Sequence, residues 1–443
     1  MVGCGARSQM YQDALQRTYR DRAELVGLCD VNAGRLALAQ ARSIANGAAV
    51  PDAAPPDGLE ALLGRVNAQV VIVLTRDAVH HDFIIRAMNA GCDVITEKPM
   101  TTTAEACLQI AEARRRTGRR CRVTFNYRYS PPRSQVKALL MEGVIGDVLS
   151  VDFHWLLNTI HGADYFRRWH SDKANSGGLM VHKATHHFDL INWWLGAVPV
   201  AVSGSGSRQF YTPEMARRMG LSGPHERCHT CPEAHLCSFR LDLAAVPSLR
   251  DLYLDQEGHD GYFRDRCVWR PEIGIEDTMS VQVKYDTGAS LSYSLQAYNA
   301  WEGYTIAFNG SRGRLEHTME EQVYVSGRDE IQGGMEEERV SIRVIPLRGA
   351  ARDIPVWKAE GSHGGGDPVL LDDLFSGESR PDPYGRVADD RAGAYSAAVG
   401  IAANRSFITG ATVPISGLIP GIERPDYPPM PTRADPVPMP PPM

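Results

Sequence analysis

The sequence has no run near the roughly 18 apolar residues that a membrane span needs, and no basic segment leading into an apolar one that would indicate a secretory signal. It has no basic excess, since 47 Lys and Arg against 53 Asp and Glu give a formal net charge of −6, which argues against a nucleic-acid-binding protein. Cysteine is scarce, with 9 in 443 residues, and this excludes a small disulfide scaffold. We therefore expect neither membrane nor nucleic acid among its partners, and a reducing, cytoplasmic location.

The first 125 residues alternate strand and helix patterns. Hydrophobic residues (43%) and charged residues (23%) occur at ordinary levels, which indicates a globular chain, and the length favours two or three domains. Alternation of this kind predicts right-handed βαβ units and a parallel sheet. The expected strands are 23–30, 68–75, 92–96 and 121–125, and the expected helices include 32–44 and 103–117.

After residue 126 the pattern changes to period-two strands, which predicts an α+β domain with a mainly antiparallel sheet. Strands are expected at 148–157, 278–285, 289–297 and 304–309, with a hairpin turn at 286–288 and a late helix at 386–407. From residue 413 the chain is rich in proline, so we expect an extended tail. The predicted domains are 1–125, then 126–410 with a Cys-rich insertion at about 210–275, then the tail at 411–443.

A glycine loop opens the chain. The segment 3–8 (GCGARS) fits G-x-G-x-x-G except for Ser8 at the last position. Gly3 allows a tight turn, Gly5 lets the backbone approach a pyrophosphate at a helix N-terminus, and Ser8 permits close helix–strand packing. Asp30 ends the second strand, where a carboxylate binds ribose hydroxyls and repels a 2′-phosphate, which favours NAD over NADP. The alternative is an ordinary strand–turn–helix with a surface Asp.

Only Met1 and Val2 precede Gly3, whereas the first strand of a dinucleotide-binding domain needs about five residues. We therefore expect either a clipped start or a natural chain that begins upstream, where there would also be room for a targeting signal.

Two further motifs carry chemistry. Glu97-Lys98-Pro99 follows the strand at 92–96, at the carboxyl end where open α/β sheets bind ligands; Lys98 is a candidate catalytic ammonium, and a surface salt bridge with Glu97 is the alternative. His182, His186 and Asp189 are spaced i, i+4 and i+7, so on one helix they would share a face. That face could serve catalysis, hold a metal ion or be structural.

Together these motifs, with the segments 126–131 (NYRYSP) and 177–196 (GGLMVHKATHHFDLINWWLG), resemble the glucose–fructose oxidoreductase / inositol dehydrogenase family, the Gfo/Idh/MocA group. The resemblance covers residues 1 to about 200 through motifs, and extends to about 410 through the order of elements. It implies a Rossmann domain followed by a domain with an open, mainly antiparallel sheet.

The resemblance also assigns roles. Lys98 matches the family's catalytic lysine, and His186 and Asp189 match the histidine and last acid of its D-x-G-x-H-x-x-D pattern. The first acid of that pattern, which often completes the proton network in relatives, is replaced here by His182, so the resemblance leaves the identity of the proton donor open. Thr75 and His80 match the loop beside the nicotinamide. The predicted cofactor-binding residues are Gly3, Gly5, Ala6, Arg7, Ser8, Asp30, Thr75, His80, Glu97, Lys98 and Asn126.

The implied reaction is NAD-dependent transfer of a hydride to or from a hydroxyl carbon of a sugar, cyclitol or glycoside. His186 would take the hydroxyl proton, Lys98 would stabilise the alkoxide, and Asp189 or His182 would orient the imidazole. The predicted substrate-binding residues are Arg128, Tyr165, Arg168, Trp169, His170, Lys183 and His187. The alternatives are an NAD-retaining lyase, epimerase or glycoside-cleaving enzyme that oxidises a sugar hydroxyl transiently, and a non-enzymatic redox sensor. We expect a homo-oligomer, a dimer or tetramer, because an open sheet leaves a broad face to cover.

Cys228, Cys231, Cys237 and Cys267 form a C-x₂-C-x₅-C…C pattern in the insertion. Four thiolates suit tetrahedral zinc, which would stabilise an insertion with little core of its own. An iron–sulfur cluster and free or disulfide-bonded thiols are the alternatives.

Overall fold

The computed structural model describes residues 1–322, 325, 333–377 and 381–440. Its N-terminal part is a parallel sheet whose strands are β1 (Gly27–Cys29), β2 (Asp52–Ala54), β3 (Val70–Val73), β4 (Asp93–Thr96) and β5 (Cys121–Val123). β1 pairs with β2, and β4 lies between β3 and β5. The two halves are joined by Val2, which bridges Cys29 on one side and Val73 on the other, both in parallel. Here a single bridging residue takes the place of the first strand that the sequence predicts.

Helices flank this sheet, and their ends follow from local sequence. They are α1 (Ser8–Asp13), a π-helical turn (Ala14–Thr18), α2 (Ala33–Ala45), α3 (Leu59–Arg65), α4 (His80–Asn89) and α5 (Ala104–Thr117). Asn32 caps α2 and Thr103 caps α5 by accepting from backbone N–H groups. Within the described residues, no helix is long and apolar enough to cross a membrane.

The second part of the chain is built on a nine-stranded sheet in the order β13-β12-β11-β10-β6-β9-β8-β7-β14. Its strands are β6 (Val148–Asn158), β7 (Pro199–Ser207), β8 (Thr278–Tyr285), β9 (Ser290–Asn299), β10 (Glu302–Gly310), β11 (Gly313–Glu321), β12 (Met335–Pro346), β13 (Arg352–Ile354) and β14 (Val413–Pro414). All neighbours are antiparallel except β6 and β9. The fold class predicted from the sequence is therefore confirmed.

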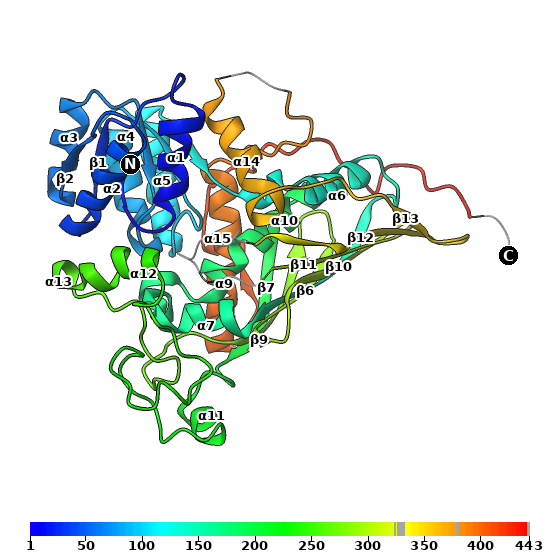
Figure 1. Ribbon diagram of the computed structural model, residues 1–443. Helices are drawn as coiled ribbons and strands as arrows, with labels where there is room; N and C mark the ends of the chain where they lie inside the picture. Colours follow the sequence, from blue (N-terminus) through cyan, green and yellow to red (C-terminus); the bar gives the residue numbers. More distant parts are fainter. Residues whose placement is uncertain (323–324, 326–332, 378–380, 441–443) are drawn as a thin grey trace.

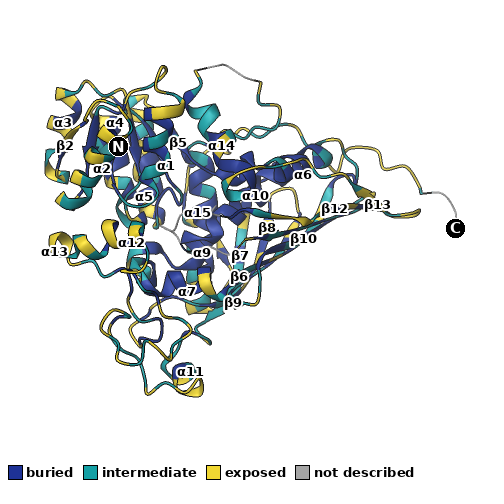
Figure 2. Cartoon of the chain, viewed as in Figure 1, coloured by how far each residue is buried: buried dark blue, intermediate teal, exposed yellow. Residues whose placement is uncertain are grey.

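Helices cover one face of this sheet. They include α6 (Pro131–Met141), α7 (Thr159–Arg167), α9 (Leu179–His182), α10 (Ala184–Leu195) and α15 (Asp390–Thr409). Along β8 every second residue is buried beneath them, from Met279 to Tyr285, as a half-covered strand requires. Figure 2 shows α10 and α15 as largely buried ribbons between the sheet and the N-terminal part.

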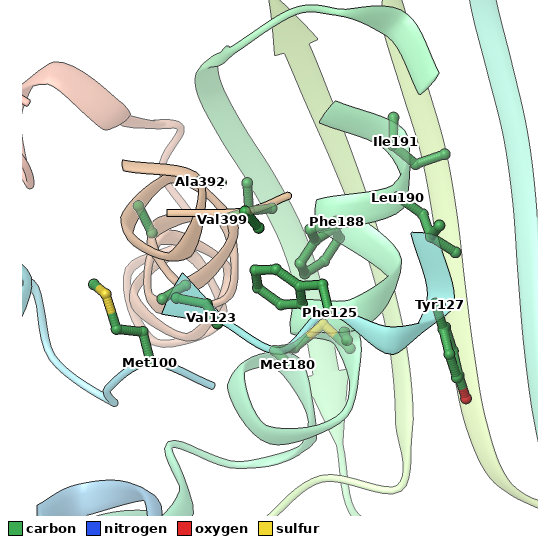
Figure 3. Close-up of a cluster of buried hydrophobic side chains, with 14 of the residues drawn as sticks. Met100, Val123, Phe125, Tyr127, Met180, Phe188, Leu190, Ile191, Ala392 and Val399 are labelled. Carbon is green, nitrogen blue, oxygen red and sulfur yellow. The ribbon is translucent and has the colours of Figure 1, made fainter. Parts of the chain in front are cut away.

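Helix α15 joins the two parts. It packs against α5 and β5 on one side and against β7 and α10 on the other. In the cluster drawn in Figure 3, Met100 and Val123 from the N-terminal part meet Ala392 and Val399 of α15, with Phe188 of α10 nearby. A continuous apolar core therefore fixes the N-terminal part relative to the second sheet.

The cysteine-rich insertion lies between β7 and β8 and carries α11 (Pro213–Arg218), α12 (Pro247–Leu252) and α13 (Glu257–Asp260). The expectation that it has little core is wrong. Phe210, Tyr211, Phe239 and Trp269 pack against one another as aromatic pairs, and Leu241, Leu243, Leu249 and Leu252 form a second buried cluster. The insertion thus holds its shape through side-chain packing.

Two local expectations also change. The motif expected on one helix is split, because α9 ends at His182 and α10 begins at Ala184. The start of the proline-rich tail packs on its own chain: β14 pairs with β7, and Ile419 and Ile422 are buried. Strands β7, β11, β12 and β13 and helix α14 (Ser362–Phe375) are not among the predicted elements.

Candidate active site

A cavity of about 690 Å³ runs between the carboxyl ends of the first sheet, the segment containing α7 and α9, and the insertion. Most of the residues predicted from the sequence line it. These are Gly3, Gly5, Ala6, Arg7, Asp30, Thr75, His80, Glu97, Lys98, Asn126, Tyr165, Arg168, Trp169, His170, His182 and His186. Ser8, Arg128, Lys183, His187 and Asp189 are not part of the lining.

The glycine loop has the geometry of a phosphate cradle. Gly3 has φ +94°, and a Cβ there would lie 2.6 Å from the carbonyl oxygen of Leu74, so a larger residue is excluded. A Cβ on Gly5 would meet only the Tyr253 hydroxyl, 4.0 Å away, which leaves space above the loop. Asp30 accepts from the N–H of Cys4 at 2.6 Å and so ties the end of β1 to the loop. These residues fit a dinucleotide with its pyrophosphate at the start of α1.

Two residues of the loop, Ser8 and Arg7, make hydrogen bonds that hold the loop in place. Ser8 donates its hydroxyl to the carbonyl of Gly5 at 2.7 Å. The Arg7 guanidinium donates to Glu97 at 2.7 Å and to Asp367 of α14 at 3.1 Å. Asn126 also donates to Asp367, at 2.6 Å, while its Oδ1 atom is buried without a partner in the described part of the chain. Asp367 therefore organises the loop, and Asn126 lines the cavity with one acceptor that has no partner among the described residues.

The Thr75 loop is held against the Glu97-Lys98-Pro99 motif by His80. The two ring nitrogens of His80 each lie 2.9 Å from a backbone carbonyl oxygen, one of Thr75 and one of Pro99. His80 is buried and borders the cavity, so these two contacts position the Thr75 loop beside the Glu97-Lys98-Pro99 motif.

Lys98 extends from the end of β4 into the cavity, where its ammonium lies 3.4 Å from the carbonyl oxygen of His182. Burial lowers the pKa of Lys98 to about 8, although the charges of Asp77 and Glu97 oppose that effect. A buried lysine with this pKa is charged at neutral pH and can still exchange its proton near physiological pH.

His186 lines the same cavity from the first turn of α10 and stacks on the ring of Tyr127, with centroids 4.2 Å apart. Its Nδ1 atom is buried and has no hydrogen-bond partner among the described residues. Burial, together with the charges of Lys98 and Lys183, lowers its pKa well below the ordinary value. The imidazole is therefore neutral at physiological pH, which is the form that a general base requires.

His182 pairs with a carboxylate that the sequence did not indicate. Its Nδ1 atom lies 2.5 Å from Oδ2 of Asp77, in the turn after β3. Burial and the charge of Lys98 lower the pKa of His182, and burial raises the pKa of Asp77. An acid from the N-terminal part of the chain thus accompanies the histidine that replaces the first acid of the family pattern.

Asp189 does not orient His186, contrary to the prediction. Its two oxygens accept from Arg128 at 2.6 and 2.7 Å, and both side chains are 1% exposed. In a buried bidentate pair of this kind each charge is already paired. Arg128 is therefore not available to bind a substrate. With Asp189 engaged, the metal site considered for His182, His186 and Asp189 does not form.

Lys183 and His187 also lie behind the cavity wall, contrary to their predicted role in substrate binding. Lys183 donates to the Tyr127 hydroxyl at 3.1 Å. His187 lies 2.6 Å from the hydroxyl of Tyr293 and stacks on Trp155. Both support the layer on which His186 rests.

A second polar network, missed by the sequence analysis, meets the cavity at Tyr165. The Tyr165 hydroxyl lies 2.9 Å from Nε2 of His161, and Nδ1 of His161 contacts Glu302 at the start of β10. Burial raises the pKa of Glu302 to about 8. These residues are 141 positions apart at the furthest, so no local pattern could have joined them.

The remaining predicted substrate residues form one wall. Trp169 stacks on His170 with centroids 3.6 Å apart. Arg168 shares the carboxylate of Asp164 with Arg264, at 3.5 and 2.7 Å respectively. Aromatic faces beside fixed polar groups are typical of the lining of a small-molecule site.

The four insertion cysteines line one small pocket, and all nine cysteines of the chain are free. In the part of the chain that the structure describes, no group of three or more His, Cys, Asp or Glu side chains is placed to hold a metal ion. The predicted zinc site at Cys228, Cys231, Cys237 and Cys267 is therefore not supported, and the insertion is held by its aromatic core instead.

Comparison with known proteins agrees with this architecture. Residues 1–125 match the model of an oxidoreductase family with an NAD-binding Rossmann fold, and residues 137–415 match the C-terminal alpha/beta domain of the same family, designated GFO_IDH_MocA. Over 416 residues the chain is 38% identical to the oxidoreductase YteT of Bacillus subtilis strain 168, covering 90% of this chain and 94% of that protein.

Two other relatives are more distant. An inositol 2-dehydrogenase of Gluconacetobacter diazotrophicus is 38% identical over 154 residues, 34% of this chain and 43% of that protein. The crystal structure of the WlbA dehydrogenase of Bordetella pertussis with NADH and UDP-GlcNAcA has the same fold, with a TM-score of 0.61 and 20% identity over 93% of this chain and 97% of that one. This chain belongs to the Gfo/Idh/MocA family of NAD-binding oxidoreductases.

Proposed function

We propose that this protein transfers a hydride between NAD and a hydroxyl carbon of a sugar, cyclitol or glycoside. The observation that carries the proposal is that Lys98 and His186 line the same cavity as the glycine loop and Asp30. NAD, when bound, supplies the hydride acceptor. What remains for the protein is to bind the alcohol, remove its proton and stabilise the resulting charge.

His186 takes the hydroxyl proton, because its imidazole is neutral and lines the cavity. Lys98 donates a hydrogen bond to the oxygen as negative charge develops there. His182 stays beside Lys98, whose ammonium contacts its carbonyl oxygen, and Asp77 fixes the orientation of the His182 ring. Tyr165, Arg168, Trp169 and His170 line the part of the cavity that receives the polyol.

The named relatives support net hydride transfer over the redox-neutral alternative, because one is a dehydrogenase of inositol and the other an oxidoreductase. Asp30 supports NAD over NADP as the working cofactor. A homo-oligomeric state (dimer or tetramer), a cytoplasmic location and domain boundaries at residues 125 and 410 are further proposals that rest on the sequence.

The test is a screen of purified protein with NAD against inositols, aldoses, uronic acids and glycosides, following NADH formation. We expect one of these classes to give turnover that Lys98→Met lowers about 100- to 1,000-fold. Binding of NAD without turnover of any polyol in either direction would contradict the proposed substrate class, and failure to bind NAD would contradict the proposal as a whole.

A further inference from the structure

The insertion lines the cofactor end of the main cavity, in addition to the small pocket that its cysteines line. Tyr253, His259 and Asp260 line the main cavity together with Asp30 and Arg35. Figure 1 shows α12 and α13 of the insertion directly beside the N-terminal part of the chain. The cofactor end of the cavity is therefore assembled from two segments that are more than 200 residues apart.

Three contacts join these segments. The N–H of Ala6 donates to the Tyr253 hydroxyl at 3.3 Å, and the side chain of Asn32 donates to the carbonyl of Gln256 at 3.0 Å. The approach is so close that a Cβ on Gly34 would lie 1.7 Å from the Gln256 side chain. The insertion is thus docked on the glycine loop and on the start of α2.

The third contact joins Arg35 to Asp260. The Arg35 guanidinium forms an ion pair with Asp260 and also lies 3.5 Å from Asp30. The Arg35 side chain is 11% exposed and the Asp260 side chain 14% exposed, so solvent screens the pair only partly. One guanidinium between two carboxylates leaves this end of the cavity with a net negative charge.

The position of Arg35 connects this charge balance to the choice between NAD and NADP. In dinucleotide-binding domains, an arginine near the end of the second strand accommodates the 2′-phosphate of NADP. Arg35 follows β1 at this place, in the first turn of α2. Here its charge is already neutralised by Asp260, and a phosphate dianion would face two carboxylates.

We propose that Asp260 of the insertion is a specificity-determining residue that excludes NADP by holding Arg35. The inference deepens the proposed function, on whose NAD site it rests. Asp30 repels the 2′-phosphate by its own charge. Arg35 is the one cation of the segment 30–35 that could offset this repulsion, and Asp260 engages it in an ion pair.

The test compares the affinity of the purified protein for NAD and NADP by calorimetry without substrate, in the wild type and Asp260→Asn. Asn keeps the oxygen that accepts from the N–H of Tyr262 while it removes the charge. We expect NADP affinity to rise about tenfold or more, because Arg35 released from Asp260 can pair with the 2′-phosphate, and NAD affinity to stay within about threefold.

Two further variants make the outcome decisive. Asp255→Asn removes an exposed carboxylate of the same segment and should leave both affinities unchanged. Arg35→Ala combined with Asp260→Asn should lose the gain in NADP affinity, because the gain is due to Arg35. Asp260→Ala, with thermal melting as a check on folding, replaces Asp260→Asn if that variant is unstable.

Unchanged NADP affinity in folded Asp260 variants, or a gain that persists without Arg35, would overturn the inference. Such a result leaves the proposed function standing as long as the wild type binds NAD. Failure of the wild type to bind either dinucleotide would instead contradict the proposed function itself.

Discussion

Asp77 and His182 lie 105 positions apart in the chain, and their side chains meet with Oδ2 2.5 Å from Nδ1. Asp77 follows a strand of the first sheet, and His182 ends a helix that covers the second. The contact therefore spans the cavity wall beside Lys98. It sets a carboxylate beside His182, the residue that stands in this sequence where the family pattern carries its first acid.

Replacing Asp77 with Asn should lower kcat and shift its pH dependence. The negative charge of Asp77 raises the pKa of Lys98, so its removal should move the loss of Lys98 protonation to lower pH. We expect kcat to fall about 10- to 100-fold. The alkaline limb of its pH profile should move to lower pH. Asp82→Asn, an exposed carboxylate on α4, is the matched control. A normal pH profile in Asp77→Asn would count against this role.

Lys98→Met should remove the donor that stabilises charge on the substrate oxygen. The loss of one such donor costs about 100- to 1,000-fold in rate, and we expect that loss in kcat/KM while the Kd for NAD changes little. Lys358→Met, at an exposed position, should retain full activity. Loss of NAD binding in Lys98→Met with unchanged turnover at saturation would assign the lysine to the cofactor alone.

Wild-type activity should decline as pH rises through about 8. Burial brings the pKa of Lys98 to about 8, and the proposed role requires the ammonium form, which is present below that pH and lost above it. Lys98→Arg should remove this alkaline limb, because a guanidinium stays charged, even if its maximal rate is reduced. An alkaline limb that is the same in Lys98→Arg as in the wild type would show that another group titrates.

Asp189→Asn should damage stability more than catalysis. Removing one partner of the buried Arg128–Asp189 pair leaves an uncompensated charge, at a cost of about 3–5 kcal/mol in the free energy of unfolding. Denaturant unfolding would measure this loss, and kcat/KM should stay within about threefold at temperatures where the variant is folded. A variant of normal stability with strongly reduced kcat would restore Asp189 to the catalytic group.

The elements that the sequence predicts well are those with a local signal. The apolar strands that became β3 and β4, the capped helices α2 and α5 and the turn between β8 and β9 all carry such signals. Helix α14 has none, because its first turns contain Gly364, Gly365 and Gly366 and are interrupted by Pro368. Its Asp367 nevertheless holds Arg7 and Asn126 at the loop.

In the candidate site, too, the residues that belong to a local motif could be predicted and their distant partners could not. Lys98 and His186 carry motif signals, and both line the cavity. The partners of the site residues do not carry such signals, because each pairing joins distant segments. Spacing alone suggested that Asp189 faces His186, whereas the break between α9 and α10 and the competing charge of Arg128 direct it elsewhere. Burial and charge pairing in three dimensions decided these roles.

In the proposed mechanism, Lys98 and His186 act on one hydroxyl group. A double-mutant cycle tests it most directly, by single-turnover hydride transfer from the polyol identified in the screen, in Lys98→Met, His186→Asn and the double variant. Because residues that act as a unit are strongly non-additive, we expect the double variant to be about as slow as the slower single variant. Rate losses that multiply would show that the two side chains act independently, and would contradict the account.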